Sequence, residues 1–521
     1  MKTMLWPVLA VVLAACAGSP PYRTAIQAQA GYDCTAVYRD GHIADDLKAQ
    51  GARASCWLSS WERHPGYDLY SVEFDDQGWL ADEVKYPGVK PDQISNLMQG
   101  LETLSAGKGN PQPLSLIIYT HGWHHSAKPD DDNVAAFRVL LASTDAVERD
   151  LCLARRHISG TPPPGVCADG EQVPAWQKKR RVVGVYVGWR GDSVQGWGLK
   201  QTSIWDRKLA AEKVSHGSVI EFYDRLHAYY SHHNCHSGAR LARKLLDRCA
   251  DVRMLTIGHS FGGLITYRAL EPTLLSNIIE TAGDGGGTAD IPYAYSFGEL
   301  TVLLNPAFEG TRFEPLARAA AARDYQPGQE SGPRPTAQLP MLLVVQSKGD
   351  DATGDLFPLF RRATTLFEST DGPENQADIH TVGWTRRYQT HELRLDPAFT
   401  ACDPAKDPSC LDQRLTAEAR WYEKQRHDNW LRIFNAQHFA MSDGLVLDKL
   451  RPESDAYALA RPNFMPVWVI MADAAVIKDH NDFLNPHLVD FVRQVYSAIL
   501  NEEDRNVEQV RSGRIKEAAA E

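Results

Sequence analysis

The chain has 521 residues, a length that suits either several average domains or one large domain with additions. Hydrophobic residues make up 43% of the sequence and charged residues 23%, as in an ordinary soluble globular protein. The formal net charge is -11, so nucleic acid is not expected as a partner.

The N-terminus has the pattern of a lipoprotein signal peptide. Lys2 precedes the apolar stretch Met4–Leu13, which is shorter than the ~20 residues of a membrane-spanning helix. Leu13-Ala14-Ala15-Cys16 then resembles a bacterial lipobox, at which residues 1–15 are removed and Cys16 is acylated. A stable anchor needs more than one acyl chain. An ordinary secretory signal that ends near Ala15 or Ala17 is the alternative.

The lipobox also bears on the location of the protein. Because Ala17 rather than Asp follows the cysteine, the resemblance implies the outer membrane of a bacterial cell envelope. No later segment is long and apolar enough to span a bilayer. The expected membrane partner is therefore reached through the lipid on Cys16, whereas the sequence names no protein partner.

Eight further cysteines form an even set, which suggests disulfides in an exported chain. They fall into four neighbouring couples, each far from the next along the chain: Cys34 and Cys56, Cys152 and Cys167, Cys235 and Cys249, and Cys402 and Cys410. We expect this local pairing, in which each disulfide closes a short loop. Free buried thiols are the alternative for some of them.

The chain divides into segments of different character. Residues 16–110 are rich in turn formers and aromatic side chains and have no catalytic signature, so they are predicted to be an N-terminal extension. Residues 111–360 form the predicted core. Its expected strands are Leu114–Thr120, Arg181–Trp189, Val252–Ile257, Leu300–Leu304 and Met341–Val345, and its expected helices include Asn133–Arg149 and Leu241–Leu246.

Residues 361–461 are too many for a simple connection, so they are predicted to be an insertion that could cap the site, with a helix at Thr416–Phe434. Residues 462–500 complete the core with a strand, Val467–Met471, and a helix, Pro486–Leu500. Residues 501–521 are charged and expected to be a flexible tail. Alternating strands and helices, with continuous apolar runs in the strands, predict an α/β fold whose mostly parallel sheet is covered on both faces.

The most informative motif is Gly258-His259-Ser260-Phe261-Gly262, a G-x-S-x-G pentapeptide. The predicted strand Val252–Ile257 enters it, and the residues from Gly263 onward have the pattern of a helix. A strand, a sharp turn and a helix are the setting in which this motif exposes a nucleophilic serine. The glycines Gly258 and Gly262 remove side chains that would clash in such a turn.

A serine hydroxyl needs a base, and the base needs an orienting carboxylate. Asp350 follows the predicted strand Met341–Val345 and is the first choice for the acid, with Asp351 as the alternative and Asp355 and Asp443 as weaker ones. His480 follows the last predicted strand and is the expected base, with His487 and His438 as alternatives.

A developing oxyanion needs hydrogen-bond donors. His121-Gly122-Trp123 follows the first core strand, where a His-Gly turn is similar to an oxyanion-binding motif of hydrolases. By this likeness, the donors are the backbone amides of Trp123 and Phe261. A purely structural turn is the alternative.

Together, these motifs resemble those of the α/β-hydrolase superfamily over about residues 111–500. Two further segments also resemble sequence motifs of bacterial hydrolase-like lipoproteins of the esterase and lipase type. They are Val187-Gly188-Trp189-Arg190-Gly191 and Leu304-Asn305-Pro306-Ala307-Phe308. The resemblance implies an α/β-hydrolase fold and a serine hydrolase that cleaves carboxylic esters through an acyl-enzyme. The long N-terminal part and the insertion before His480 depart from simple esterases.

Three other functions compete with ester hydrolysis. An acyltransferase would use the same triad, and a surface lipoprotein could use the scaffold for binding without turnover. Metal catalysis would need ligands such as His121, His124 and His125, or the cluster at 232–236, but H-E-x-x-H and paired C-x-x-C motifs are lacking. We therefore expect no metal and no cofactor.

Overall fold

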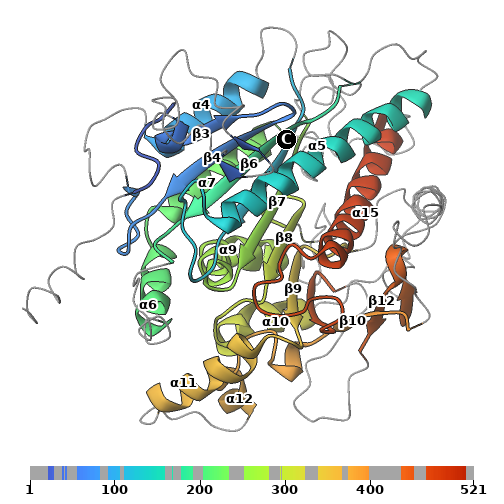
Figure 1. Ribbon diagram of the computed structural model, residues 1–521. Helices are drawn as coiled ribbons and strands as arrows, with labels where there is room; N and C mark the ends of the chain where they lie inside the picture. Colours follow the sequence, from blue (N-terminus) through green and yellow to red (C-terminus); the bar gives the residue numbers. More distant parts are fainter. Residues whose placement is uncertain are drawn as a thin grey trace, which may run out of the picture.

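The computed structural model describes residues 21–27, 38–39, 42–43, 56–81, 92–105, 111–158, 167, 178–191, 204–233, 251–280, 294, 296–322, 338–365, 373–397, 436–450 and 465–511. Most of these residues belong to one α/β layer structure built on an eleven-stranded sheet (Figure 1). A separate two-stranded sheet pairs β1 (Tyr38–Arg39) with β2 (His42–Ile43). Among the described helices, none combines the length and apolar character that a membrane crossing requires.

The large sheet is mostly parallel. Its strands, in spatial order, are β11 (His438–Ala440), β12 (Leu445–Lys449), β10 (His391–Leu395), β13 (Val467–Ala472), β9 (Leu342–Ser347), β8 (Leu300–Leu304), β7 (Val252–His259), β5 (Leu114–Thr120), β6 (Arg181–Gly188), β4 (Tyr67–Glu73) and β3 (Trp61–Arg63). Neighbours from β10 to β4 run parallel, whereas β3, β11 and β12 pair in antiparallel fashion at the two edges. All six core strands expected from the sequence are present.

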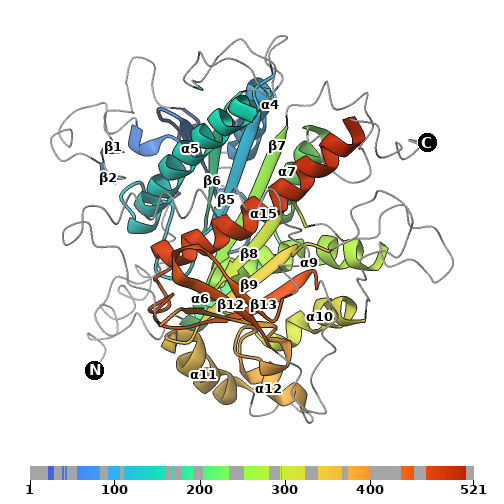
Figure 2. The ribbon, with the colours of Figure 1, turned by 90° about the vertical axis from the view of Figure 1, so that its right-hand side faces the viewer.

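Helices cover both faces of this sheet, because the side chains of each strand alternate between two apolar layers. On β5, Leu116 and Ile118 face one layer, and Ile117 and Tyr119 face the other. The first layer includes α4 (Gln93–Ser105), α6 (Ile204–Val214), α7 (Val219–His233), α9 (Phe261–Glu280), α10 (Glu314–Ala321) and the start of α11 (Phe357–Thr364). The second includes α5 (Asp132–Ile158) and α15 (Pro486–Arg511), which cover the same face of the sheet (Figures 1 and 2). The expected α/β class with a covered, mostly parallel sheet is thereby confirmed.

Shorter elements connect the strands beyond β8 and β9. They are the 3-10 helices η6 (Gly310–Phe313), η8 (Arg386–Tyr388) and η9 (Ser442–Gly444), the π-helix η7 (Ala352–Leu356) and the helix α12 (Pro373–Ile379). The predicted insertion at 361–461 therefore contributes α12 and the strands β10, β11 and β12, which extend the sheet. Its expected helix at Thr416–Phe434 lies outside the described residues, as does the expected helix at Leu241–Leu246.

The sheet also reaches into the predicted N-terminal extension, since β3 and β4 belong to it. The strand β4 was not predicted from the sequence because three of its buried side chains are polar: Asp68, Ser71 and Glu73. Their burial is compensated locally. Arg181 pairs with Asp68 at 2.9 Å, and the Glu73 carboxylate accepts the backbone N–H of Arg23 at 2.7 Å.

Two further expectations need correction or limitation. The helix expected to end at Leu500 continues to Arg511, because residues 501–511 hold neither Pro nor Gly and consist mainly of good helix formers. Cys152 and Cys167 form the expected disulfide, and Cys56 is also disulfide-bonded. The other cysteines of the predicted pairs, Cys34, Cys235, Cys249, Cys402 and Cys410, lie outside the described residues.

A buried charge cluster fixes the first described segment to the sheet. Glu62 accepts hydrogen bonds from Arg23 at 2.8 Å and from both Nε and Nη2 of Arg138 at 2.9 Å. Burial alone would raise the pKa of Glu62, but Arg138 and Arg23 hold it well below its usual value. All three side chains are at most 2% exposed, so the carboxylate and the two guanidinium groups depend on one another.

Replacing Glu62 should therefore destabilise the protein strongly. We expect Glu62→Gln to lower the free energy of unfolding by about 3–5 kcal/mol, because two buried cations lose their counter-charge. Chemical denaturation followed by circular dichroism measures this. The control is Glu102→Gln, whose side chain is 53% exposed and pairs with His233, and which should change stability by less than about 0.5 kcal/mol. Equal effects of both variants would contradict the expected role of the cluster.

Candidate active site

Ser260 lies at a sharp turn between β7, which ends at His259, and α9, which begins at Phe261. Its backbone has a φ of 55°, a conformation that non-glycine residues adopt rarely and at a cost of about 1–3 kcal/mol. Neighbouring backbone holds this conformation in place. The Ser260 N–H donates to the Leu304 carbonyl at 3.0 Å, and the Ser260 carbonyl accepts the Ala307 N–H at 3.1 Å.

The two glycines of the motif are required by close approach. A Cβ atom on Gly262 would lie 2.2 Å from the Thr120 carbonyl oxygen and 2.4 Å from that of His121. A Cβ atom on Gly258 would lie 2.8 Å from Oγ1 of Thr266. The turn therefore packs directly against the carboxyl end of β5, which is where the predicted oxyanion-binding turn begins.

Ser260, His480 and Asp350 form one continuous hydrogen-bonded chain. The Nε2 atom of His480 lies 2.8 Å from Oγ of Ser260, and its Nδ1 atom lies 2.8 Å from Oδ2 of Asp350. A carboxylate can only accept at Nδ1, so it favours the imidazole tautomer with a proton on Nδ1 and a lone pair on Nε2. That lone pair is placed to accept the serine proton.

Asp350 is held rigidly in this chain. The Thr353 N–H donates to Oδ1 at 3.1 Å, and Oδ2 accepts the Thr353 hydroxyl at 2.6 Å and the Gln346 amide at 3.0 Å. Burial raises the pKa of Asp350, but His480 and the bonds from Thr353 outweigh it, so that the pKa is lowered. Asp350 is buried, whereas the alternative Asp351 is exposed.

Two side chains clamp the backbone of His480. The His480 carbonyl accepts Nε2–H of His259 at 2.8 Å and the Nδ2 amide of Asn305 at 3.1 Å. The carbonyl oxygen of the Asn305 amide in turn accepts the Ser347 N–H at 2.8 Å and Nε2 of Gln346 at 3.3 Å. The loop that carries His480 is thus tied to the ends of β7, β8 and β9.

Sequence reasoning missed the positioning roles of Asn305, Gln346 and Thr353. Asn305 belongs to the motif Leu304–Phe308, which resembles a motif of hydrolase-like lipoproteins. Its φ of 43° indicates a strained turn after β8. Gln346 lies inside a strand and Thr353 inside a helix, where polar residues give no catalytic signal. Their shared feature is burial in one hydrogen-bond network around Asp350 and His480, which arises only from the folded arrangement.

The His121-Gly122-Trp123 turn lies against Ser260. A Cβ atom on Gly122 would come within 2.7 Å of the Cβ atom of Ser260. His121 is buried and acts as a spacer: its Nδ1 bonds the Gly122 carbonyl at 2.9 Å, and its Nε2 accepts the Trp189 N–H at 3.1 Å. The indole N–H of Trp189 donates back to the His121 carbonyl at 2.8 Å.

The backbone amides of Phe261 and Trp123 are available as donors. Phe261 is the first residue of the 20-residue helix α9, so its N–H has no acceptor within the helix and lies at the positive end of the helix dipole. The Trp123 N–H makes no hydrogen bond to any residue that the structure describes. Phe261 directly follows Ser260 in the chain, and Trp123 directly follows Gly122, which approaches Ser260 closely, so both amides belong to residues beside the serine turn.

The rival residues make other contacts. His438 pairs with Asp448 at 2.7 Å on β11 and β12, and the backbone N–H of His487 bonds the Asn485 side chain at the start of α15. Asp355 is exposed, and Asp443 lies in η9 before β12. Within the described part of the chain, no group of three or more His, Cys, Asp or Glu side chains could hold a metal ion. His125 pairs with Asp131 at 3.0 Å, and Cys235 and His236 lie outside the described residues.

Two buried histidines beside the site are held neutral. Burial lowers the pKa of His121 to about 4 and that of His259 to about 3, and in the latter case the nearby His480 adds to the effect. Both residues stay uncharged at neutral pH, so they can support the turn and the His480 loop without repelling a charged His480.

Comparison with known proteins gives no relative from which a function could be transferred. No protein-family model, no curated protein and no solved structure matches the chain. The geometry around Ser260 is therefore the basis for a functional assignment.

Acid should destabilise the fold through these two histidines. Their folded pKa values lie below the ordinary value of about 6.5, so the unfolded chain binds more protons between about pH 6.5 and 3. Stability is then fully present above pH 6.5 and is lost as the pH falls through that range. We expect His259→Gln, which keeps an amide donor for the His480 carbonyl but does not titrate, to flatten the slope of unfolding free energy by about one proton. Chemical denaturation at several pH values between 7 and 4 measures how the free energy of unfolding depends on pH. The same pH dependence in wild type and His259→Gln would refute the lowered pKa of His259.

Proposed function

We propose that this protein is an exported, lipid-anchored serine hydrolase of the α/β-hydrolase fold that cleaves carboxylic esters through an acyl-enzyme. The observation that carries the proposal is the hydrogen-bonded chain from Ser260 through His480 to Asp350, with 2.8 Å at each link. Its members come from three loops that are 90 and 130 positions apart in the sequence. A chain of nucleophile, base and carboxylate is the arrangement that activates a serine.

The proposed reaction has two halves. In the first, Oγ of Ser260 bonds to the ester carbonyl carbon while Nε2 of His480 takes its proton. The Trp123 and Phe261 amides donate to the resulting oxyanion. The tetrahedral intermediate then expels the alcohol, which receives the proton from His480, and leaves an acyl group on Ser260.

In the second half, water attacks the acyl-enzyme and gives its proton to His480. Collapse of the second tetrahedral intermediate returns that proton to Oγ of Ser260 and releases the carboxylic acid. Asp350 stays ionised throughout and stabilises the charged imidazole, in agreement with its lowered pKa and its three hydrogen bonds from Gln346 and Thr353.

The arrangement of the sheet supports the hydrolase fold. Ser260 follows β7, Asp350 follows β9 and His480 follows β13, so all three come after the carboxyl ends of parallel strands. The order of serine, acid and histidine along the chain is that of α/β-hydrolases. The proposed oxyanion turn follows β5, the strand beside β7, as in that fold.

The first prediction of this proposal concerns the nucleophile. A fluorophosphonate probe should label the wild-type protein once, and the label should map to Ser260. Ser260→Ala should abolish labelling and lower ester hydrolysis by about 10⁴-fold or more, because the remaining groups cannot form an acyl-enzyme. Labelling that persists in Ser260→Ala, or a folded wild type that does not react, would contradict the proposal.

The second prediction separates the two neighbouring aspartates. Asp350→Asn should lower kcat by about 10⁴-fold, because an amide favours the wrong tautomer of His480. Asp351→Asn is the matched control: its side chain is exposed and should leave kcat within a few-fold of wild type. Hydrolysis of a water-soluble nitrophenyl ester measures both. A loss confined to Asp351→Asn would reverse the assignment.

A further inference from the structure

Two helices beside the site present apolar side chains to solvent. On α6, Leu209 is 61% exposed, and on α11, Leu359 is 63% exposed. The helices meet through the rings of Trp205 and Phe360, whose centroids lie 5.8 Å apart at an interplanar angle of 82°. Trp205 and Leu209 share one helix face, as do Leu359 and the preceding turn residue Leu356. We call these five residues (Trp205, Leu209, Leu356, Leu359 and Phe360) the α6–α11 surface.

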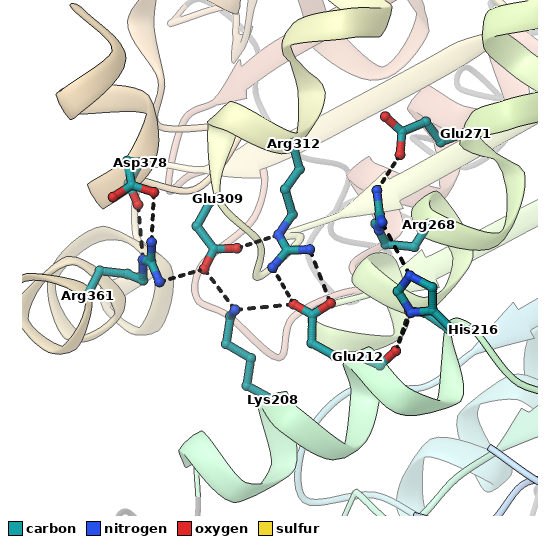
Figure 3. Close-up of polar contacts among 10 residues, drawn as sticks. Lys208, Glu212, His216, Arg268, Glu271, Glu309, Arg312, Arg361 and Asp378 are labelled. Carbon is teal, nitrogen blue, oxygen red and sulfur yellow. Dashed lines mark hydrogen bonds and ion pairs between the residues drawn. The ribbon is translucent and has the colours of Figure 1, made fainter. Parts of the chain in front are cut away.

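A network of ion pairs around the buried carboxylate of Glu309 links α6 to α11 (Figure 3). Glu309, which follows β8, pairs with Lys208 of α6 at 2.8 Å and with Arg361 of α11 at 3.3 Å. Arg312 links Glu309 to Glu212 of α6 at 2.8 and 2.7 Å. Although burial raises the pKa of Glu309, Lys208 and the two arginines lower it to about 2.

The network also restricts the movement of the neighbouring apolar residues of the α6–α11 surface. Lys208 is adjacent to Leu209, and Arg361 follows Leu359 and Phe360, so the charged groups fix the turns that carry the apolar side chains. The exposed leucines therefore belong to a rigid, preorganised surface. Single exposed apolar residues need no explanation, but a joined set on two fixed helices suggests a contact surface.

This surface lies at the edge of the sheet where Ser260 lies. Arg207 of α6 bonds Asp76 at 2.8 Å and the Arg190 carbonyl at 2.9 Å, two residues just beyond the carboxyl ends of β4 and β6. The helix α11 follows β9 through the Asp350 loop and η7. Figures 1 and 2 show α11 and α12 at one end of the molecule, beyond these strand ends.

The first described residues reach the same edge. The backbone N–H groups of Tyr22 and Arg23 donate to the carboxylate of Glu73, the last residue of β4, at 3.0 and 2.7 Å. Nε of Arg23 donates to the Ala127 carbonyl, beyond β5, at 3.0 Å. Cys16 is only seven positions before Arg23, and seven extended residues span at most about 25 Å. A lipid on Cys16 therefore keeps this edge of the sheet close to its bilayer.

We propose that the α6–α11 surface docks on the lipid bilayer that holds the Cys16 anchor, and that Ser260 thereby acts on amphiphilic esters presented by that bilayer. The docking part rests on the proposed lipid attachment, and the substrate part rests also on the proposed hydrolase function. The short tether brings the edge to the membrane, and transfer of the two leucines from water into the acyl boundary stabilises the docked orientation.

The test uses the mature protein, acylated at Cys16, in phosphatidylcholine vesicles that contain a small fraction of phosphatidylcholine with a photoactivatable diazirine in its acyl chain. After illumination, digestion and mass spectrometry should find lipid adducts on peptides from α6 and α11. Ile279 is the internal reference, because it is 59% exposed but lies at the far end of α9, about 30 Å of helix from Ser260. Its peptide should stay unlabelled.

Matched variants sharpen this test. The double variant Leu209→Asp/Leu359→Asp should lose lipid adducts on α6 and α11 about tenfold or more, because both side chains then favour water. It should also lower the ratio of activity on a vesicle-embedded ester to activity on a water-soluble ester. Ile279→Asp, which replaces an equally exposed residue, should change neither quantity. Thermal melting verifies that the variants are folded.

The possible outcomes separate the proposals. Adducts on α6 and α11 without any ester cleavage would keep the docking and reject the hydrolase function. Adducts at the end of α9, adducts confined to residues upstream of Tyr22, or equal adducts in wild type and the double variant would overturn the docking. Cross-links between two protein chains through α6 and α11 would overturn it in favour of self-association.

Discussion

The close approach of the serine turn to the end of β5 is the constraint on which the site depends. Gly262 lies so near to the Thr120 and His121 carbonyls that no side chain fits between them, and a Cβ atom on Gly122 would also come too close to Ser260. This contact fixes the strained backbone of Ser260 and brings the turn after β5 beside it. Because β5 and β7 are parallel neighbours, both turns emerge at one edge, and the proposed oxyanion donors and the nucleophile share a location without any long connection.

Polar side chains tie the remaining parts of the site to this edge, in addition to the apolar packing of Val476, Ile477 and Phe483 around His480. His259 and Asn305 hold the carbonyl of His480, and Gln346 and Thr353 hold the carboxylate of Asp350. Each of these four residues is buried, where an unmet hydrogen bond costs about 1–3 kcal/mol. The cost makes alternative positions of the loops unfavourable, so the burial of polar groups produces the alignment that the chemistry needs.

The sequence was most informative where apolar runs and turn residues occur together. The core strands β5, β6, β7, β8, β9 and β13 were predictable because each is a short apolar run bounded by loops. The positions of Ser260, Asp350 and His480 were predictable because each follows such a run. The strand β4 was not, since its buried Asp68, Ser71 and Glu73 mimic an exposed segment until Arg181 and Arg23 are brought to them by the fold. The roles of Gln346 and Thr353 were not predictable for the same reason. A buried polar residue is recognisable only from its hydrogen-bond partners, and these are distant in sequence or separated by a turn.

Ion pairs with buried carboxylates hold two peripheral segments in fixed positions on the sheet. Glu62 fastens the segment around Arg23 through two arginines, and Glu309 fastens α6 and α11 through Lys208 and Arg361. Ion pairs of this kind add little net stability over apolar packing, but they tolerate few alternative arrangements because an unpaired buried charge is costly. Apolar contacts in their place would allow each segment to shift along the sheet, whereas the paired charges allow only one position. For the proposed membrane-docking surface, such directional fixing is of more use than additional stability, because it leaves the outward side chains apolar while their supporting backbone stays in place.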